Sequence, residues 1–333
     1  MKSTFIHLRH QPHSNKGYSE KLILFALRLT ALGSVNLALL SGCQSSLNTA
    51  ATRRPVAASA TAAEAQNHAK IISAVMRRDT VLFGEVHYNP AQHALRANLV
   101  RQAILQGARP AMAFEQFDRD AQPRIDTIVA TRPNSADDFL DALFPGNTRP
   151  KGWQWPLYAP LIELALQYEL PIIAANLSRA DAIKVSMSGL DAVFDSPTLT
   201  RIGLDRAVTA HVRTEQARAI KEGHCNALPD DGIAAMASAQ IARDAVLAER
   251  LRAQQDRGVI LFAGNGHTRR DVGVGYWLSG ARPFTAIGLL ERGDLTINAS
   301  GRFDITLVTE PHRRDDPCIA FRARPLPTHT PKS

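Results

Sequence analysis

Several short apolar runs of the chain each end in side chains that can move protons or bind a metal ion. Glu85 and His87 follow one such run, and Glu115 follows the next. Asn176 and His267 follow two later runs. If the runs are parallel strands, their carboxyl ends meet at one edge of a sheet, and these side chains converge on a single site. Two carboxylates and two histidines suffice to bind a divalent metal ion and activate water. Taken singly, each is more commonly a polar loop residue.

Residues near this edge also suit an anionic ligand. Pro90 opens a predicted helix whose free backbone N–H groups and dipole face the edge, with His93 in its first turn. Gly264 and Gly266 let backbone amides approach a ligand, and Arg270 adds positive charge. A solvated surface position is the alternative for His93 and for the arginine. The pattern therefore predicts an edge that favours carboxylates.

Aromatic side chains concentrate in residues 153–158, in a chain that is only 6% aromatic. Trp153, Trp155 and Tyr158 supply flat rings beside the polar edge, which would suit a large planar ligand. For Trp155 the alternative is packing in a small core, because Tyr158 begins an amphipathic helical pattern.

The elements that position these side chains follow the pattern of an α/β protein. We predict a mostly parallel sheet flanked by helices, with a helical insertion over about residues 117–250 that forms a lid or second lobe. Strands are predicted at residues 80–84, 111–114, 171–175, 259–263, 284–289 and 305–309. Helices are predicted at residues 90–106, 121–130, 135–143, 157–168, 179–187 and 203–256, the last with a break at 225–231.

The N-terminal region has the layout of a bacterial lipoprotein signal. An apolar run at residues 29–40 follows basic residues and leads into Leu40-Ser41-Gly42-Cys43. The run is too short to span a membrane. We therefore expect residues 1–42 to be a signal peptide, Cys43 to carry the lipid (palmitate included), and residues 43–65 to be a flexible tether. Gln44 favours the outer membrane, facing the periplasm or the cell surface. Residues 325–333 are expected to be a disordered tail.

Charge and cysteine content narrow the choice of partners. Residues 1–42 hold five basic and one acidic side chain, which leaves +4 of the formal charge of +8 on the remaining chain. This excess is too small and dispersed for nucleic acid, and it suits a small acidic ligand or an anionic lipid surface. Apart from Cys43, the cysteines are Cys225 and Cys318. A pair in an exported chain predicts a disulfide, with two buried thiols as the alternative.

Several motifs recur together, in a fixed order, between about residues 68 and 321. They are Gly84-Glu85-Val86-His87 with His93, Phe114-Glu115-Gln116, Trp155-Pro156-Leu157-Tyr158, Gly223-His224-Cys225, Ala239-Gln240 with Arg243-Asp244, and Gly264-Asn265-Gly266-His267 with Arg270-Asp271. In this order, after a lipobox, they resemble the ChaN family of haem-binding lipoproteins of bacterial iron uptake, which is grouped with the Tiki proteases and erythromycin esterases. The chain departs from that pattern at Tyr88, where the family tends to have an acidic residue.

The resemblance implies haem as the ligand, a homodimer that buries haem between subunits, and an outer-membrane haem uptake receptor as a partner. The candidates for the iron ligand are His87, Tyr158 and His267, and the candidates for the propionate partners are Arg270, His93 and Lys151. Trp155 is expected beside the porphyrin. The alternative is a metal-dependent hydrolase of the same superfamily, in which Glu85, His87, Glu115 and His267 hold a divalent metal ion or act as acid and base.

Overall fold

The computed structural model describes residues 56–206, 208–278, 280, 282–294, 301–316 and 318–319. Its centre is a six-stranded sheet in the order β3-β2-β4-β1-β5-β6, and all neighbouring strands are parallel. The strands are β1 (Thr80–Phe83), β2 (Ala111–Asp118), β3 (Ile172–Asn176), β4 (Val259–Phe262), β5 (Phe284–Glu291) and β6 (Ile305–Thr309). The six predicted strands and the α/β fold are therefore confirmed.

The register of the central strands brings the site together. Phe83, the last residue of β1, pairs with Phe262 of β4 on one side and with Ile287 of β5 on the other. Phe114 of β2 also pairs with Phe262. The segments that follow β1, β2 and β4 thus leave the sheet at the same edge, as expected for parallel strands.

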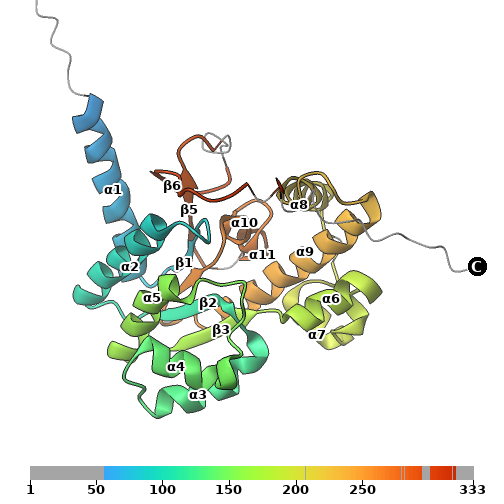
Figure 1. The fold of residues 1–333 in the computed structure, drawn as a ribbon, viewed down its shortest axis with the longest axis horizontal. Coiled ribbons are helices and arrows are strands. Elements are labelled where there is room, and N and C mark those ends of the chain that lie inside the picture. The colour runs from blue at the N-terminus through green and yellow to red at the C-terminus, as the bar shows by residue number, and fades with distance from the viewer. Residues whose placement is uncertain are drawn as a thin grey trace, which may run out of the picture. The chain divides into compact units, whose positions relative to one another are not determined.

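Helices cover both faces of the sheet (Figure 1). The α-helices are α1 (Val56–Met76), α2 (Pro90–Leu105), α3 (Gln122–Ala130), α4 (Ala136–Leu143), α5 (Trp155–Gln167), α6 (Arg179–Ser188), α7 (Ser196–Ile202), α8 (Ala210–Gly223), α9 (Asp230–Arg252), α10 (Asn265–Thr268) and α11 (Val274–Leu278). Three 3₁₀ turns lie between them, η1 (Arg119–Ala121), η2 (Pro145–Asn147) and η3 (Leu190–Ala192).

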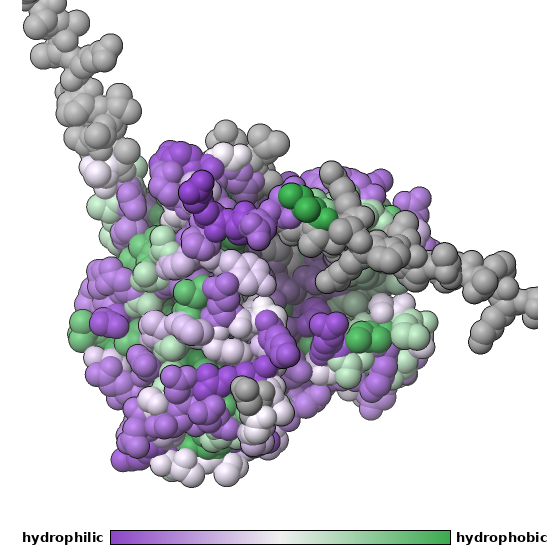
Figure 2. Space-filling view, in the orientation of Figure 1, coloured by the Kyte–Doolittle hydropathy of each residue, from purple (hydrophilic) through white to green (hydrophobic). Residues whose placement is uncertain are grey.

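Alternating strand residues build two cores, one on each face. Val81 and Phe83 point into a core shared with α1 to α5, whereas Leu82 points into a core shared with α6 to α9 and α11. The central strands β1 and β4 are buried along their whole length, which explains their unbroken apolar sequences. The face of the molecule in Figure 2 is mainly hydrophilic, with apolar residues in small separate patches.

Two boundaries differ from the sequence prediction. Helix α1 begins at Val56, so residues 56–65 are helical and do not belong to a flexible tether. Their alanine content explains this, because alanine has the highest helix propensity even where little surface is buried. The predicted insertion at 117–250 is interrupted by β3, and residues Arg54–Ser333 form one compact unit, so its helices are not a separate lobe.

The predicted disulfide is present between Cys225 and Cys318, whose Cα atoms lie 5.5 Å apart. It links the turn between α8 and α9 to the segment after β6. The predicted signal peptide at 1–42, the predicted lipidation site Cys43 and the predicted tail at 325–333 lie outside the described residues. Within the described residues, no helix combines the length and apolar character needed to cross a membrane.

Candidate functional site

Glu85 is the centre of a buried polar cluster at the carboxyl end of β1. One carboxylate oxygen, Oε1, accepts hydrogen bonds from Tyr158 Oη at 2.7 Å and His87 Nδ1 at 2.8 Å. The other oxygen, Oε2, pairs with the guanidinium of Arg96 and lies 3.3 Å from His93 Nε2. Asn89 makes this possible by capping α2, because its side chain accepts from two backbone N–H groups and starts the helix that carries His93 and Arg96. Both oxygens of the buried carboxylate are thereby occupied.

His93 is neutral in this cluster. Burial lowers its pKa to about 4, and the hydrogen bond to the His87 carbonyl does not offset that effect. Its Nδ1 lies 3.0 Å from Arg96 Nη2, which is always a donor, so Nδ1 accepts and Nε2 carries the proton. Nε2 then donates to the His87 carbonyl at 3.0 Å. Burial lowers the pKa of Arg96 to about 10, which leaves it cationic at neutral pH.

A second cluster joins the carboxyl ends of β2 and β4 through His267. Nδ1 of His267 lies 2.5 Å from Asp244 Oδ1, and Nε2 lies 3.4 Å from Glu115 Oε1. Burial alone would lower the pKa of His267, but the carboxylates of Glu115 and Asp244 outweigh it and raise the pKa to about 10. Burial would raise the pKa of Glu115, yet His267 and the backbone N–H of Gly264 hold it at about 2. His267 is therefore an imidazolium between two carboxylates.

His87 lies between the two clusters and is only partly buried. Its Nδ1 is bonded to Glu85, and burial lowers the pKa of the ring, so the neutral imidazole donates from Nδ1. Its Nε2 faces Gly264, where a Cβ atom would lie 3.0 Å away, which explains why this position needs glycine. Nε2 forms no hydrogen bond with a described residue. A histidine held by a carboxylate at one nitrogen and free at the other is the arrangement of a metal-ligating imidazole.

A cavity of about 570 Å³ opens beside these clusters, at the carboxyl ends of β2 and β3. We call it the strand-end cavity. Its lining is Glu115, Gln116, Phe117, Asp118, Ala121, Phe144, Pro150, Lys151, Gly152, Trp153, Asn176, Arg179 and Arg243. Three aromatic rings thus share the cavity with three cationic side chains. The ring of Trp153 meets that of His87 edge to face at 5.0 Å between centroids, which connects the cavity to the Glu85 cluster.

Three polar groups of the cavity suit an added ligand. Gln116 is buried, and its amide nitrogen and oxygen have no hydrogen-bond partner among the described residues. Lys151 and Arg179 are exposed at the cavity, and neither forms an ion pair within the part of the chain that the structure describes. Arg243 is fixed by Asn176 Oδ1 at 2.9 Å and the Leu177 carbonyl at 3.0 Å. The cavity therefore offers free cationic and amide groups beside an aromatic wall.

The structure brings together the four predicted strand-end residues Glu85, His87, Glu115 and His267, whereas other predicted residues lie elsewhere. Trp155 packs in the core with its ring stacked on Phe117, and its indole N–H donates to the Pro150 carbonyl at 3.1 Å. The segment's cavity-facing ring is Trp153, because Trp155 begins α5 on its buried side.

Most of the predicted iron and propionate ligands do not line the strand-end cavity. Tyr158 and His267 are buried, and their polar atoms are bonded to carboxylates. His93 is buried behind Glu85 and does not lie on the surface. Arg270 pairs with Asp304 at 2.5 Å and covers the Phe284 ring, and it does not line the strand-end cavity. Lys151 does line it, as predicted.

Sequence reasoning misses several side chains of the site. It gives no role to Arg96, Gln116, Arg179, Arg243 or Asp244, although each lies in a cluster or lines the cavity. A sequence pattern points weakly to Arg96, because this residue lies three positions after His93 and therefore on the same face of α2. Among the described residues, no group of three or more His, Cys, Asp or Glu side chains is arranged to hold a metal ion.

The fold and the site are those of an α/β protein with a ligand cavity at the carboxyl ends of a parallel sheet. A family model described as haem-binding uptake, Tiki superfamily, ChaN matches residues 71–278, more than half of the chain, so the protein belongs to this family. The predicted family is confirmed, and haem is the ligand that the family's description names.

A solved structure agrees with this fold. It is described as cofacial haem binding to ChaN of Campylobacter jejuni, and it matches with a TM-score of 0.55 and 17% identity, over 66% of this chain and 85% of that chain. A mutant of the erythromycin esterase EreC in its open conformation matches with a TM-score of 0.38 and 15% identity, over 67% and 72%. The type III effector HopBA1 matches with 0.38 and 13%, over 74% and 94%. At these identities the likeness concerns the fold alone. No curated protein matches the sequence significantly.

Proposed function

We propose that this protein binds haem in the strand-end cavity and takes part in bacterial iron or haem uptake. The observation that carries the proposal is a cavity that combines aromatic walls with cations that form no ion pair among the described residues, in a chain that belongs to a haem-binding uptake family. A porphyrin is a large apolar plane that carries two carboxylates at one edge. Phe144 and Trp153 suit the plane, and Lys151 and Arg179 suit the carboxylates.

His87 is our assignment for the residue that reaches the iron. Of the three candidates, it is partly exposed and has a ring nitrogen without a hydrogen-bond partner among the described residues. Glu85 would hold the ring through Nδ1 and increase the basicity of Nε2. In this arrangement Tyr158 and His93 support Glu85 from behind and do not touch the ligand.

The membrane location and the partners belong to the same proposal. The lipobox at Leu40–Cys43 supports an outer-membrane lipoprotein anchored through Cys43, with the described domain beginning only 13 residues later at Val56. A homodimer and a haem uptake receptor are proposed from the family. Cys43→Ala should abolish acylation and leave the precursor uncleaved, and fully soluble native protein in intact cells would refute the anchor.

Haemin titration of the purified full-length protein tests the haem site. We expect a saturable Soret shift at about one haemin per chain. His87→Ala should change the spectrum of the bound haemin, because it removes the iron ligand. Lys151→Gln and Arg179→Gln should each weaken binding about tenfold with little spectral change, since they remove a charge-assisted hydrogen bond to a propionate.

Matched variants make this test decisive. His211→Ala replaces an exposed histidine of α8 and should leave both affinity and spectrum unchanged. Haemin binding no tighter than to an unrelated protein of similar charge would refute the site. An unchanged spectrum in His87→Ala, with a changed spectrum in Tyr88→Phe, would move the iron ligand to the neighbouring Tyr88, whose side chain is exposed beside Gly152.

A hydrolase is the second candidate, and one observation favours it. The neutral His87, which packs against Gly264, and the cationic His267 are each held by a carboxylate, and they are near enough for His267 to affect the pKa of His87, which is a pairing suited to a general base and a general acid. Glu115→Gln separates the two functions. It should retain most haemin binding if Glu115 only supports the site, whereas it should abolish hydrolysis of an ester substrate if the pair is catalytic. Hydrolysis lost in this variant, in a protein that does not bind haemin saturably, would favour the enzyme.

A further inference from the structure

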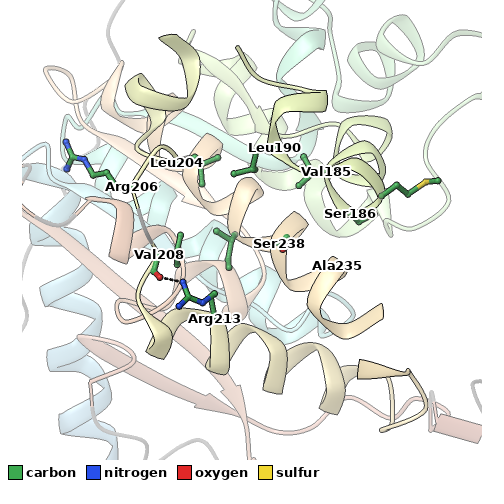
Figure 3. A pocket seen from close by; sticks show the side chains of 12 residues that line it. Val185, Ser186, Leu190, Leu204, Arg206, Val208, Arg213, Ala235 and Ser238 are labelled. Atoms are coloured by element: carbon green, nitrogen blue, oxygen red, sulfur yellow. Dashed lines mark hydrogen bonds between the residues drawn. The ribbon is translucent and has the colours of Figure 1, made fainter. Parts of the chain in front are cut away.

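A second cavity lies apart from the strand-end cavity, between α6 and α8 (Figure 3). Helices α6 and α8 both pack on α9, and the space between them forms a cleft of about 430 Å³, which we call the α6–α8 cleft. It shares no lining residue with the strand-end cavity. Its volume falls within the range of small-molecule binding sites.

Most of the lining of the α6–α8 cleft is apolar. Val185, Leu190, Leu204 and Ile241 contribute aliphatic side chains from α6, η3, the segment before α8, and α9. Met187 lies at the cleft with 79% of its surface exposed, the highest value among the exposed large hydrophobic residues of the described chain. An exposed, flexible thioether beside an apolar hollow is a feature of surfaces that adapt to an apolar ligand.

The polar character of the cleft is cationic. Arg206 and Arg213 line it, and no acidic side chain does. One nitrogen of Arg213 donates to the Val208 carbonyl, which leaves other donors of the guanidinium available. Arg206 forms no ion pair with any residue that the structure describes. Figure 3 shows Arg213 at the end of the cleft near Val208, with Ser186 and Ala235 toward the opposite end, whereas the side chain of Arg206 points outward from the cleft.

The ends of the chain are unsuitable occupants of this cleft because of their charge. Residues 320–333 contain three basic and no acidic side chains, and residues 43–55 contain two basic and no acidic side chains. Both segments would bring positive charge to the two arginines. An occupant with an anionic group is favoured.

We propose that the α6–α8 cleft binds the carboxylate of a long-chain fatty acid, with the acyl chain on the aliphatic lining and the carboxylate on Arg213. The exposed side chain of Arg206 turns inward to donate to the same carboxylate when the ligand binds. A guanidinium suits a carboxylate because it offers two parallel N–H donors. A single acyl chain suits a cleft of about 430 Å³ better than the two chains of a phospholipid. This inference does not depend on haem binding at the strand-end cavity.

Photolabelling of the full-length protein in detergent tests the proposal. The probe is a palmitate analogue that carries a diazirine in its acyl chain, and labelled peptides are mapped by mass spectrometry. We expect saturable labelling of α6, α8 or α9, displaced by palmitate but not by hexadecanol, which lacks the carboxylate. Displacement by phosphatidylglycerol but not by palmitate would overturn the assignment to a fatty acid.

Single substitutions test the contributions of the arginines and of the apolar lining to palmitate binding separately. Arg206→Gln and Arg213→Gln should each weaken palmitate competition about tenfold, because each loses a charge-assisted hydrogen bond. Ile241→Trp should block labelling by filling the cleft. Arg101→Gln, an exposed arginine of α2, is the control and should change nothing. Both arginine variants are exposed positions and should fold normally, so labelling that neither reduces would refute the proposal.

Haemin titration of the same variants keeps the two sites distinct. Arg206→Gln should bind haemin like the parent protein. If it loses haemin binding while Lys151→Gln retains it, the α6–α8 cleft is the haem site, and both proposals fail in a recognisable way. Loss of palmitate labelling with normal haemin binding supports the fatty-acid site alone.

Discussion

His93 and His267 are both buried at the strand ends beside carboxylates, yet they carry different charges at neutral pH. His93 lies beside Glu85 and Arg96, and burial lowers its pKa to about 4. His267 lies between Glu115 and Asp244, which together raise its pKa to about 10. Burial acts in the same direction on both rings, so the neighbours decide the outcome.

The difference lies in how each carboxylate is neutralised. The charge of Glu85 is already matched by Arg96, so a second cation at His93 would be unpaired and costly to bury. Glu115 and Asp244 have no such matching arginine bonded to them among the described residues, and His267 supplies the positive charge for both. The state of a buried histidine therefore follows from the charges of the whole cluster and cannot be assigned from its nearest neighbour.

This contrast gives the two clusters different roles. The Glu85 cluster holds His87 neutral and oriented, with Nε2 available to a ligand. The His267 cluster fixes Glu115 as a carboxylate at the wall of the strand-end cavity. Changing the charge in either cluster should reveal how far each supports the fold.

Replacing Arg96 by methionine should have the largest effect on stability. It leaves Glu85 buried without its cation, and we expect a loss of about 4 kcal/mol in the free energy of unfolding. Urea unfolding followed by tryptophan fluorescence measures the loss. Arg101→Met changes an exposed arginine of the same helix and should alter stability by less than about 0.5 kcal/mol.

A double variant tests the cause of that loss. Glu85→Gln combined with Arg96→Met removes both charges and should recover part of the stability lost in Arg96→Met. A loss below about 1 kcal/mol in the single variant would show that Glu85 does not depend on Arg96 for its charge balance.

Replacing His267 by glutamine should cost about 3 kcal/mol near pH 6, because two buried carboxylates lose their shared cation. The effect should depend on pH. The folded-state pKa of His267 exceeds the value of about 6.5 for an unfolded histidine, so the imidazolium stabilises the fold fully below pH 6.5 and less as the pH rises to about 10. The difference between parent and variant should therefore shrink over this range. A difference that grows toward pH 10 would contradict the assigned charge.

The contribution of His93 to the free energy of unfolding should depend on pH below 6.5, where the contribution of His267 is constant. Its folded-state pKa lies below that of an unfolded histidine, so the unfolded chain binds a proton that the folded chain does not between pH 6.5 and about 4. The parent should lose about 3 kcal/mol through this residue as the pH falls across that window, because each unit of pKa difference is worth about 1.4 kcal/mol. His93→Gln should lack this component. NMR titration of the ring signals checks it directly, and a His93 signal that titrates near pH 6.5 would refute the neutral state.

The sequence predicts the sheet well and the charge clusters poorly. Runs such as Val259–Phe262 are apolar because both faces of a central parallel strand are buried, so composition alone identifies them. β2 extends to Asp118, past the expected end at 114, because Glu115 and Gln116 are polar residues that remain in a buried strand. Local sequence does not reveal that a polar pair is buried.

Contacts between distant residues explain what was missed at the site. In the sequence, Arg96 looks like a solvent-exposed arginine on a helix. Only the fold reveals its ion pair with Glu85, which precedes that helix. Arg243 joins the strand-end cavity through Asn176, which lies 67 residues earlier in the chain. The sequence placed the aromatic segment correctly but could not tell that Trp153 faces the cavity and Trp155 the core.

Replacing Tyr158 by phenylalanine should have the smallest effect on the free energy of unfolding. It tests how much one hydrogen bond contributes to the Glu85 cluster. It removes one hydrogen bond to Glu85 Oε1, at 2.7 Å, while His87 and Arg96 still neutralise and bond the carboxylate. We therefore expect a loss of about 1 kcal/mol by urea unfolding. Burial raises the pKa of Tyr158, so its hydroxyl stays protonated and donates to Glu85 rather than binding iron as a phenolate. The haemin spectrum of Tyr158→Phe should accordingly match that of the parent, whereas loss of the bound spectrum with a stable fold would make Tyr158 the iron ligand.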